Sequence, residues 1–369
     1  MMQRVYIRPI GFAASPQSEN GNAVRLAGGM AYAHRFAVTV RENGEVVRRD
    51  LVAADDMAQA LGRLPDALGA EAELQWSNLR MAHLPITCGD RIVRLDQPQI
   101  MGILNVTPDS FSDGGKFLDN ADEAHGHASA MLEAGAAIID IGGESTRPGA
   151  DPVWEGEEIR RVAPAIEFCA RIGAAISVDT RRPAVMEAAV EAGAHIINDV
   201  SALNHDPRSL EYAAASGKPV VLMHAPGSGE NLHANAIYAD VVSDVFEWLR
   251  ARRDAALEAG IPAEKIILDP GLGFGKSLAE NLALMNALAL FHALGHPLLL
   301  GVSRKRMIGA LSREAEADQR LAGSLALAQV GMNAGVQLLR VHDVAETIQT
   351  RDVWRGLRDA ALTDFADQP

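Results

Sequence analysis

The sequence predicts an α/β protein whose main body is a (β/α)8, or TIM, barrel preceded by a small α+β appendage. Three observations lead to this prediction. Short apolar runs alternate with helical stretches eight times, nearly every run ends in a polar side chain, and the first 95 residues follow a different pattern. Alternation of this kind is typical of parallel sheets, and eight units in series favour a closed barrel over a doubly wound open sheet.

The apolar runs begin at about residue 98 and are short and nearly continuous, as strands buried on both faces should be. They are QIMGILN, AAIIDIGG, AAISVDT, HIINDVS, PVVLMHA, KIILDPG, PLLLGVS and VQLLRVHD. The stretches between them have helical spacing and glycine at or near their ends. Examples are ADEAHGHASAMLEAG, RPAVMEAAVEAG and SLAENLALMNALAL.

The polar ends of these runs predict where the functional site lies. In a barrel, the carboxyl ends of the strands form the mouth, and active sites of this fold lie there. One such side chain could simply cap a helix, but capping alone does not explain polar ends on essentially all runs. The residues are Asn105, Asp140, Asp179, Asn198, Asp199, His224, Asp269, Ser303, Arg340 and His342.

Residues 1–95 differ from the barrel, which we place at 96–369. Two strand-like stretches, RFAVTVREN and EVVRRDLVAA, flank the turn signal Asn43-Gly44, and a helix is expected in DDMAQALGRL. This segment holds 11 Lys+Arg and 10 Asp+Glu, so the acidity of the chain belongs to the barrel. We see no catalytic group of residues here and expect the appendage to cover the barrel bottom or to support oligomerisation.

Composition limits the class of protein. Net charge is −14, apolar content 48% and charged content 22%. These values predict a globular chain with a sizeable core, and they disfavour nucleic acid or an anionic membrane as the main partner. Cys88 and Cys169 fit no zinc or disulfide spacing, so we expect buried thiols in a reducing cytoplasm. No apolar run reaches the roughly 18 residues of a membrane span, and no signal region is seen.

The segment DPGLGFGKS (269–277) is similar to a phosphate loop, but its spacing excludes one. Only three residues separate Gly271 from Gly275, where the phosphate loop of nucleotide hydrolases needs four before its Gly-Lys pair. We interpret the glycines as a tight turn at the barrel mouth that allows close ligand approach. Lys276 and Ser277 are expected to begin the next helix.

Two long motifs, MGILNVTPDSFSDGGKF (101–117) and DIGGESTRPGA (140–150), resemble those of the dihydropteroate synthase family. The resemblance continues through SVDTRRPAVMEAAVEAGAHIINDVS, VLMHAPG, ILDPGLGFGKSLAENLALM, LLLGVSRKRMIG and LLRVHDVAET, and covers about residues 98–357. It implies the same barrel and a transferase of an alkyl group other than methyl. The reaction joins 6-hydroxymethyl-7,8-dihydropterin pyrophosphate to 4-aminobenzoate in folate biosynthesis and releases pyrophosphate. The appendage is not part of the usual family core.

The resemblance also implies which residues bind the pterin. Buried carboxylates pair well with its amino and ring N–H groups, because charge-assisted hydrogen bonds are strong. Lys305 would donate to a ring acceptor and Phe274 would contact the ring face, as would Met223 unless it only fills core. The implied pterin set is Asp140, Asp179, Asn198, Met223, Asp269, Phe274, Gly301 and Lys305.

The pyrophosphate needs cations, and the resemblance implies that Arg340 and His342 supply them. These residues are two apart at the end of a strand, so both face the same way. Asn105 would hold a Mg²⁺ ion through its side-chain oxygen, with waters and phosphate oxygens as the other ligands. The implied pyrophosphate set is Asn105, Thr146, Arg147, Arg340 and His342.

The loops after the first two strands are long, which is typical of lids and binding loops. By the same resemblance, the second loop forms the 4-aminobenzoate pocket from Thr146, Arg147 and Pro148, with Ser303. Asp109 in the first loop either steadies a developing cation or is a turn residue after Pro108.

The implied mechanism is dissociative. The C–O bond to pyrophosphate breaks early, and Asp140 or Asp109 offsets the charge of the dihydropterin cation. The neutral arylamine then attacks without a general base. Lys305 and Arg147 complete the expected catalytic set. The resemblance further implies a homodimer.

One departure and two alternatives remain. The family usually has Met-Gln-Gly after VLMH, whereas this chain has Ala225-Pro226-Gly227. A pterin-dependent methyltransferase shares the barrel but would not need the STRPG loop or the RVHD pair. A non-catalytic pterin-binding paralogue should have lost loop residues that are present here.

Overall fold

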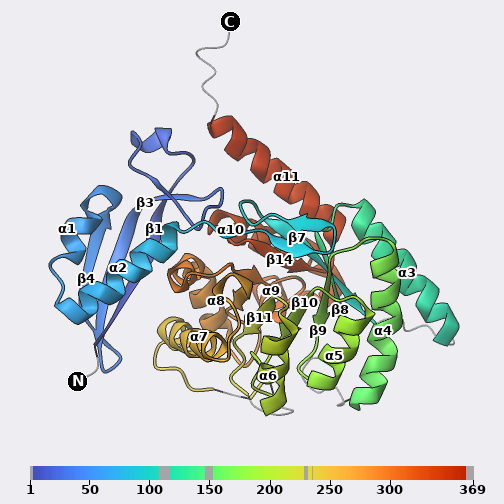
Figure 1. Ribbon diagram of the computed structural model, residues 1–369. Coiled ribbons are helices and arrows are strands. Elements are labelled where there is room, and N and C mark those ends of the chain that lie inside the picture. Colours follow the sequence, from blue (N-terminus) through green and yellow to red (C-terminus); the bar gives the residue numbers. More distant parts are fainter. Residues whose placement is uncertain (1–2, 108–116, 146–152, 228–231, 235, 363–369) are drawn as a thin grey trace, which may run out of the picture.

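The computed structural model of this chain describes residues 3–107, 117–145, 153–227, 232–234 and 236–362 (Figure 1). The predicted barrel is confirmed. Within those ranges eight parallel strands follow the order β12-β11-β10-β9-β8-β7-β14-β13, and a parallel bridge between Leu268 and Leu298 joins the two ends. The strands are β7 (Gln99–Asn105), β8 (Ile138–Gly142), β9 (Ile176–Asp179), β10 (Ile196–Asp199), β11 (Val220–Met223), β12 (Ile266–Asp269), β13 (Leu299–Leu300) and β14 (Leu338–Val341).

Helices connect the strands and lie around the barrel (Figure 1). Sequence signals set their ends. Gly193, at φ 116°, ends α5, Asp206 caps α6, and Ser277 with Glu280 forms a capping box at the start of α8. The helices are α3 (Phe117–Glu133), α4 (Glu155–Arg171), α5 (Pro183–Ala192), α6 (Pro207–Ser216), α7 (Val241–Glu258), α8 (Leu278–Asn286), α9 (Arg306–Leu311), α10 (Leu321–Asn333) and α11 (Val344–Ala361). None of the helices in the described ranges is long and apolar enough to cross a membrane.

Alternate residues of each strand face the barrel interior, because successive side chains of a strand point to opposite faces. Each strand contributes one apolar, buried side chain that faces inward at or near its start, and these side chains form one cluster. They are Met101, Ile138, Ala175, Ile196, Val221, Ile267, Leu299 and Leu338. The residues between them face outward into a larger cluster with the helices. The interior at the bottom of the barrel is therefore packed core.

A small hairpin, β5 (Ile86–Cys88) and β6 (Arg91–Val93), closes this bottom. Ile86, Cys88, Val93 and Leu95 belong to the same buried cluster as these inward residues of the strands. The hairpin precedes residue 96, yet its side chains complete the barrel core. Cys88 and Cys169 are both buried and unpaired, as expected.

The appendage contains an antiparallel sheet of β1 (Gln3–Ala13), β2 (Val24–Arg25), β3 (Tyr32–Glu42) and β4 (Glu45–Ala53). The two predicted strands are β3 and β4, joined through Asn43 and Gly44, both with positive φ as a tight hairpin turn requires. Helices α1 (Met57–Leu61) and α2 (Asp66–Arg80) cover one sheet face. Gln75 of α2 ties down the edge strand β1 by accepting from Ile7 N and donating to Val5 O.

The appendage packs against η5 (Leu288–Leu294), a 3₁₀ segment whose seven residues are all buried. The sequence predicts that the helix beginning at Ser277 runs to residue 290, but α8 ends at Asn286 and a tighter 3₁₀ segment follows. Contacts with α2 and β1 decide this conformation, and Asn78 Nδ2 donates to Ala293 O at 2.9 Å. A local helical pattern cannot reveal a partner so far away in the sequence.

Candidate active site

Arg340 lies at the centre of a charged network at the barrel mouth. Its Nε donates to Asp140 Oδ2 at 2.6 Å, and its Nη2 donates to Asp179 Oδ2 at 2.7 Å. Asn198 Nδ2 lies 3.3 and 3.2 Å from the two oxygens of Asp140, which is fully buried. The four side chains come from β14, β8, β9 and β10, and each occupies an inward position on its strand.

The network holds one cation against two carboxylates. Burial raises the pKa of Asp179, and Asp140 adds to this effect, while Arg340 opposes it. Burial alone would lower the pKa of Arg340, but Asp140 and Asp179 outweigh it and raise that pKa above its ordinary value. The guanidinium therefore stays charged, and the excess of carboxylate oxygens favours a ligand that brings N–H donors.

Asp269 and Lys305 form a second charged group at the mouth. Asp269 Oδ1 accepts from Gly271 N at 2.7 Å, and burial raises the pKa of Asp269 to about 6. Burial lowers the pKa of Lys305 to about 8, against the attraction of Asp269. Lys305 Nζ lies 4.4 Å from the centre of the Phe274 ring, and that ring stacks on His233 with centroids 4.8 Å apart. The charged groups of Asp269 and Lys305 therefore lie beside the flat ring of Phe274 at the barrel mouth.

The DPGLGFGKS segment is a locked turn beside this group. Gly271 has φ 67°, and a Cβ there would lie 1.8 Å from His224 O, so only glycine fits. Lys276 Nζ donates to the carbonyls of Gly271 at 2.7 Å and Phe274 at 3.1 Å, and lies 3.4 Å from that of His224. Lys276 therefore holds the turn together, which corrects the expectation that it begins the next helix. Ser277 is the N-cap instead.

Arg340 and His342 are engaged differently from one another. His342 Nδ1 lies 3.1 Å from Ser303 Oγ, and His342 N donates to the same oxygen at 3.2 Å. Two N–H groups of Arg340 point to carboxylates that were assigned to the pterin. The expected pterin and pyrophosphate sets therefore share Arg340, and Ser303, expected near the aminobenzoate, lies beside His342.

Asn105 lies next to Asp179 at the mouth. A Cβ placed on Gly142 would be 3.5 Å from Asp179 Cβ and 3.7 Å from Asn105 Oδ1, so the two side chains border the same small space. Across the described part of the chain, no group of three or more His, Cys, Asp or Glu could hold a metal ion. A cation here would depend on the Asn105 oxygen and on ligands from a substrate.

Several expected residues are placed with a clear physical role. Met223 and Phe274 share a buried cluster, and a Cβ on Gly301 would meet nothing within 4 Å.

Asp199 faces away from the interior, one residue after Asn198, and accepts from Ser201 N at 2.7 Å and Leu203 N at 3.1 Å. Asp199 therefore stabilises the turn after β10. It was among the polar strand ends predicted to lie at the mouth, but its side chain does not line the barrel interior.

Four expected residues lie outside the described residues: Asp109, Thr146, Arg147 and Pro148.

A buried ion-pair cluster beside the mouth was not predicted from the sequence. The Glu144 carboxylate pairs with Arg182 at 2.8 Å and with Arg181 at 3.2 Å, and Arg182 also pairs with Glu158. Glu144 Oε1 further accepts from Val153 N at 3.3 Å. One carboxylate thus connects the two chain segments that flank residues 146–152. The sequence does contain a signal for these ion pairs. Glu144 lies inside the GGESTRPG motif, and the two arginines Arg181 and Arg182 follow the next strand.

The chain is similar to known pterin-binding enzymes. The family model described as "Pterin binding enzyme" matches residues 101–342. The dihydropteroate synthase of Neisseria meningitidis is 48% identical over 269 residues, which are 72% of this chain and 94% of that protein. That of Escherichia coli is 47% identical over 260 residues, covering 70% and 91%.

A solved structure of Xanthomonas albilineans dihydropteroate synthase with 4-aminobenzoic acid superposes with a TM-score of 0.71 at 47% identity. It covers 75% of this chain and 99% of that one. The structure of the same enzyme in complex with 7,8-dihydropteroate has a TM-score of 0.68 at 45% identity, covering 74% and 98%. The shared part thus corresponds to about three quarters of the present chain and to essentially all of those relatives.

Proposed function

The chain belongs to the dihydropteroate synthase family of pterin-binding enzymes, and we propose that its barrel mouth joins 6-hydroxymethyl-7,8-dihydropterin pyrophosphate to 4-aminobenzoate. It is a transferase, and the products are 7,8-dihydropteroate and pyrophosphate. The network of Arg340 with Asp140, Asp179 and Asn198 carries this proposal, because it presents buried acceptors and one fixed cation in the same space.

The pterin is bound by the inward polar residues of the mouth. Asp179, Asp140 and Asp269 accept hydrogen bonds from its amino and ring N–H groups, Asn198 and Lys305 complete the polar contacts, and Phe274 and Met223 supply the flat apolar surface. Gly301 leaves room for the ring. Burial of Asp140 and the raised pKa of Asp269 support this role, because a carboxylate kept from water binds a complementary N–H donor strongly.

The pyrophosphate is bound next to the pterin by Arg340, His342, Thr146 and Arg147. Arg340 has five N–H donors, and two are engaged by Asp140 and Asp179, so others remain for an anion. Asn105 would hold Mg²⁺ through its side-chain oxygen, and the position of that oxygen beside Asp179 fits an ion with few protein ligands. Bound Mg²⁺ neutralises phosphate charge.

The reaction proceeds by early cleavage of the C–O bond, whose electron pair leaves with pyrophosphate. Asp140, with Asp109, offsets the positive charge that develops on the dihydropterin, while Lys305 and Arg147 orient the reacting groups. Thr146, Arg147, Pro148 and Ser303 position the 4-aminobenzoate, whose nitrogen forms the new C–N bond and then loses its proton. An arylamine is neutral near pH 7, so this chemistry needs no strong general base.

The test is a coupled assay for pyrophosphate release, run with and without 4-aminobenzoate. The proposal expects release that depends on 4-aminobenzoate and yields one dihydropteroate per pyrophosphate. Pterin binding without any release would identify a non-catalytic paralogue, and methyl transfer to a corrinoid would identify the methyltransferase alternative. Either result would overturn the proposal.

We further propose that the chain acts as a cytoplasmic homodimer. The family resemblance supports the dimer, and two buried, unpaired cysteines support a reducing compartment. Mass in solution, measured by light scattering, tests the dimer, and a mass of one chain at working concentration would contradict it.

A further inference from the structure

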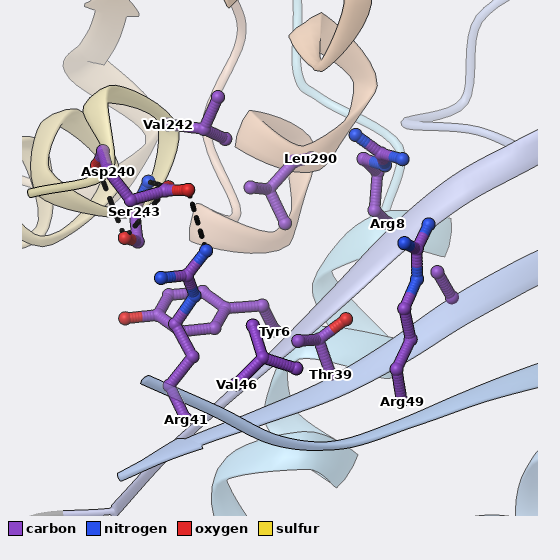
Figure 2. Close-up of a pocket in the computed structure, with 11 residues that line it drawn as sticks. Tyr6, Arg8, Thr39, Arg41, Val46, Arg49, Asp240, Val242, Ser243 and Leu290 are labelled. Atoms are coloured by element: carbon purple, nitrogen blue, oxygen red, sulfur yellow. Dashed lines mark hydrogen bonds and ion pairs between the residues drawn. The ribbon is translucent and has the colours of Figure 1, made fainter. Parts of the chain in front are cut away.

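A groove opens between the appendage sheet and the barrel (Figure 2). One wall is the sheet face that carries Tyr6, Arg8, Thr39 and Arg49. The other wall is the start of α7 together with Leu290 of η5. Its volume is about 200 Å³. None of its lining residues belongs to the proposed active site, so the groove is a separate feature.

The two ends of the groove differ in how their arginines are used. At one end, Arg41 pairs with Asp240 at 2.6 Å and also donates to Gly44 O. At the other end, Arg8 of β1 and Arg49 of β4 lie near one another (Figure 2). Within the described residues, neither Arg8 nor Arg49 has a hydrogen bond or an ion pair to a protein group. Burial and then the charge of Arg49 lower the pKa of Arg8 below its ordinary value.

The acidic groups around the groove are already neutralised. Asp240 accepts from Arg41, from Ser243 N and from Ser243 Oγ, and it caps α7. Glu247 faces Arg4 and Arg250 and accepts from Tyr6 Oη, while Asp50 pairs with Arg48. Asp240 also attracts Arg8, but it pairs with Arg41, so this single carboxylate faces three arginines and leaves an excess charge of two in a chain whose net charge is −14. All 11 basic residues of the appendage are arginine, the side chain whose planar fork matches carboxylate and phosphate oxygens.

The middle of the groove is apolar. Val46, Val242 and Leu290 face it together with the ring of Tyr6 (Figure 2). The volume of about 200 Å³ is below the range of drug-sized pockets. It is nearer to the roughly 150 Å³ that accommodates benzene in an engineered cavity. The space therefore fits a body of about one small ring.

We propose that this groove is a binding site for a small organic oxyanion, with its phosphate or carboxylate group held between Arg8 and Arg49 and a compact apolar body against Val46, Val242 and Leu290. Bound there, the ligand bridges the appendage and the barrel, because β1 and β4 lie on one side and α7 and η5 on the other. The site is independent of the transferase reaction.

Methyl NMR of the full chain, with labelled Leu and Val side chains, tests this proposal by titration with phenyl phosphate, benzoate and inorganic phosphate. The methyl groups of Val46, Val242 and Leu290 report on the groove, and those of Val200 and Leu232 report on the mouth. We expect saturable shifts of the groove methyls with phenyl phosphate or benzoate. Inorganic phosphate should bind more weakly, because it lacks the apolar body.

The matched variants are the double substitution Arg8→Gln with Arg49→Gln, and the single substitution Arg35→Gln. Arg35 lies on β3, is exposed and does not line the groove. The double variant should bind phenyl phosphate at least about tenfold more weakly, as expected for the loss of charged hydrogen bonds. Arg35→Gln should bind it like the unmodified chain. Since Arg49 is exposed, Arg49→Gln alone serves as a variant with no expected folding defect.

Three results would overturn the proposal. Shifts confined to the mouth methyls would show that the anion binds at the active site only. Equal affinity in the double variant and the Arg35→Gln control would show that Arg8 and Arg49 do not hold the anion. If inorganic phosphate bound as tightly as phenyl phosphate, the apolar part of the ligand would contribute nothing, and the proposed contacts with Val46, Val242 and Leu290 would be wrong.

Discussion

The bottom and the mouth of the barrel use inward residues of the same eight strands but hold opposite chemistry. At the bottom, the inward side chains are apolar and the β5–β6 hairpin covers them. Two residues further along the strands, the inward side chains include Asp140, Asn198, Asp269 and Arg340. On β14 the change occurs between Leu338 and Arg340. Apolar packing is thus concentrated at the bottom, and the stability it provides allows buried charges, which are costly, at the mouth.

The largest expected effect comes from Arg340→Met. This substitution leaves Asp140 and Asp179 buried without their cation and removes an anion ligand. Breaking a buried pair in this way costs about 3–5 kcal/mol of folding stability. Loss of the charged hydrogen bonds to the anion, at about 1.5–3 kcal/mol each, should in addition lower kcat/KM for pyrophosphate release by about 100-fold. The control is Arg94→Ala, which breaks an exposed pair with Asp96 and should change nothing measurable. An Arg340→Met enzyme within threefold of the unmodified rate would contradict the assignment.

Leu338→Ala tests the bottom with a change two residues away on the same strand. The side chain is fully buried, so its truncation should lower the free energy of unfolding by about 2–5 kcal/mol. Below the unfolding temperature, kcat/KM should stay within about twofold, because no mouth residue changes partner. Denaturant unfolding and the pyrophosphate assay measure the two quantities. Leu311→Ala, at an exposed position, is the control. If Leu338→Ala lost activity in proportion to stability, the two ends would not be separable.

The pH dependence of kcat/KM sharpens the comparison. Asp269 must be ionised to accept pterin N–H groups, and its raised pKa of about 6 means that this form is lost as pH falls through 6. Lys305 must be protonated, and its lowered pKa of about 8 means that its charge is lost as pH rises through 8. We expect a bell-shaped profile that falls about tenfold per pH unit outside these limits. Leu338→Ala should keep both limbs, and a flat profile from pH 5 to 9 would refute the roles of both groups.

Glu144→Gln should have the smallest effect. Glu144 connects the segments on either side of residues 146–152 through Arg182 and Val153. The amide keeps one acceptor but loses the charge that Arg181 and Arg182 share, so we expect a stability cost of about 1.5–3 kcal/mol. KM for 4-aminobenzoate should rise about fivefold, with kcat nearly unchanged. Steady-state kinetics in both substrates measure this. Asp359→Asn, in an exposed pair with Arg355, is the control. A fall in kcat at constant KM would instead indicate a direct role in the chemistry.

Most of the barrel and of its mouth could be predicted from the sequence, because a strand buried on both faces leaves a continuous apolar run that ends where the polar residues begin. The pairing of Arg340 with Asp140 and Asp179 could not, since it joins strands 161 and 200 residues apart. Asn198 and Asp199 show what periodicity could have added. Neighbouring residues of a strand face opposite ways, so only one of the two can line the interior.

The appendage was harder to predict because its elements depend on distant partners. β1 contains Pro9 and has register shifts around Gly11, which disrupt its alternating pattern and are tolerated because it is an edge strand. α2 contains Gly69 and gains its place by packing on β1 and η5. η5 in turn is apolar apart from the buried His292, and it takes its conformation from that contact. None of these causes is local in the sequence.

The contact between α2 and η5 also has a consequence for biosynthesis. Asn78 and Ala293 are 215 residues apart, and translation at roughly 5–20 residues per second separates their emergence from the ribosome by roughly 10–40 s. During that interval the residues of the appendage lack η5, the surface against which α2 and β1 pack in the folded chain. Arg8, Arg41 and Arg49, which line the finished groove, belong to this early segment, and charged side chains of this kind favour solubility while their packing partners are still missing.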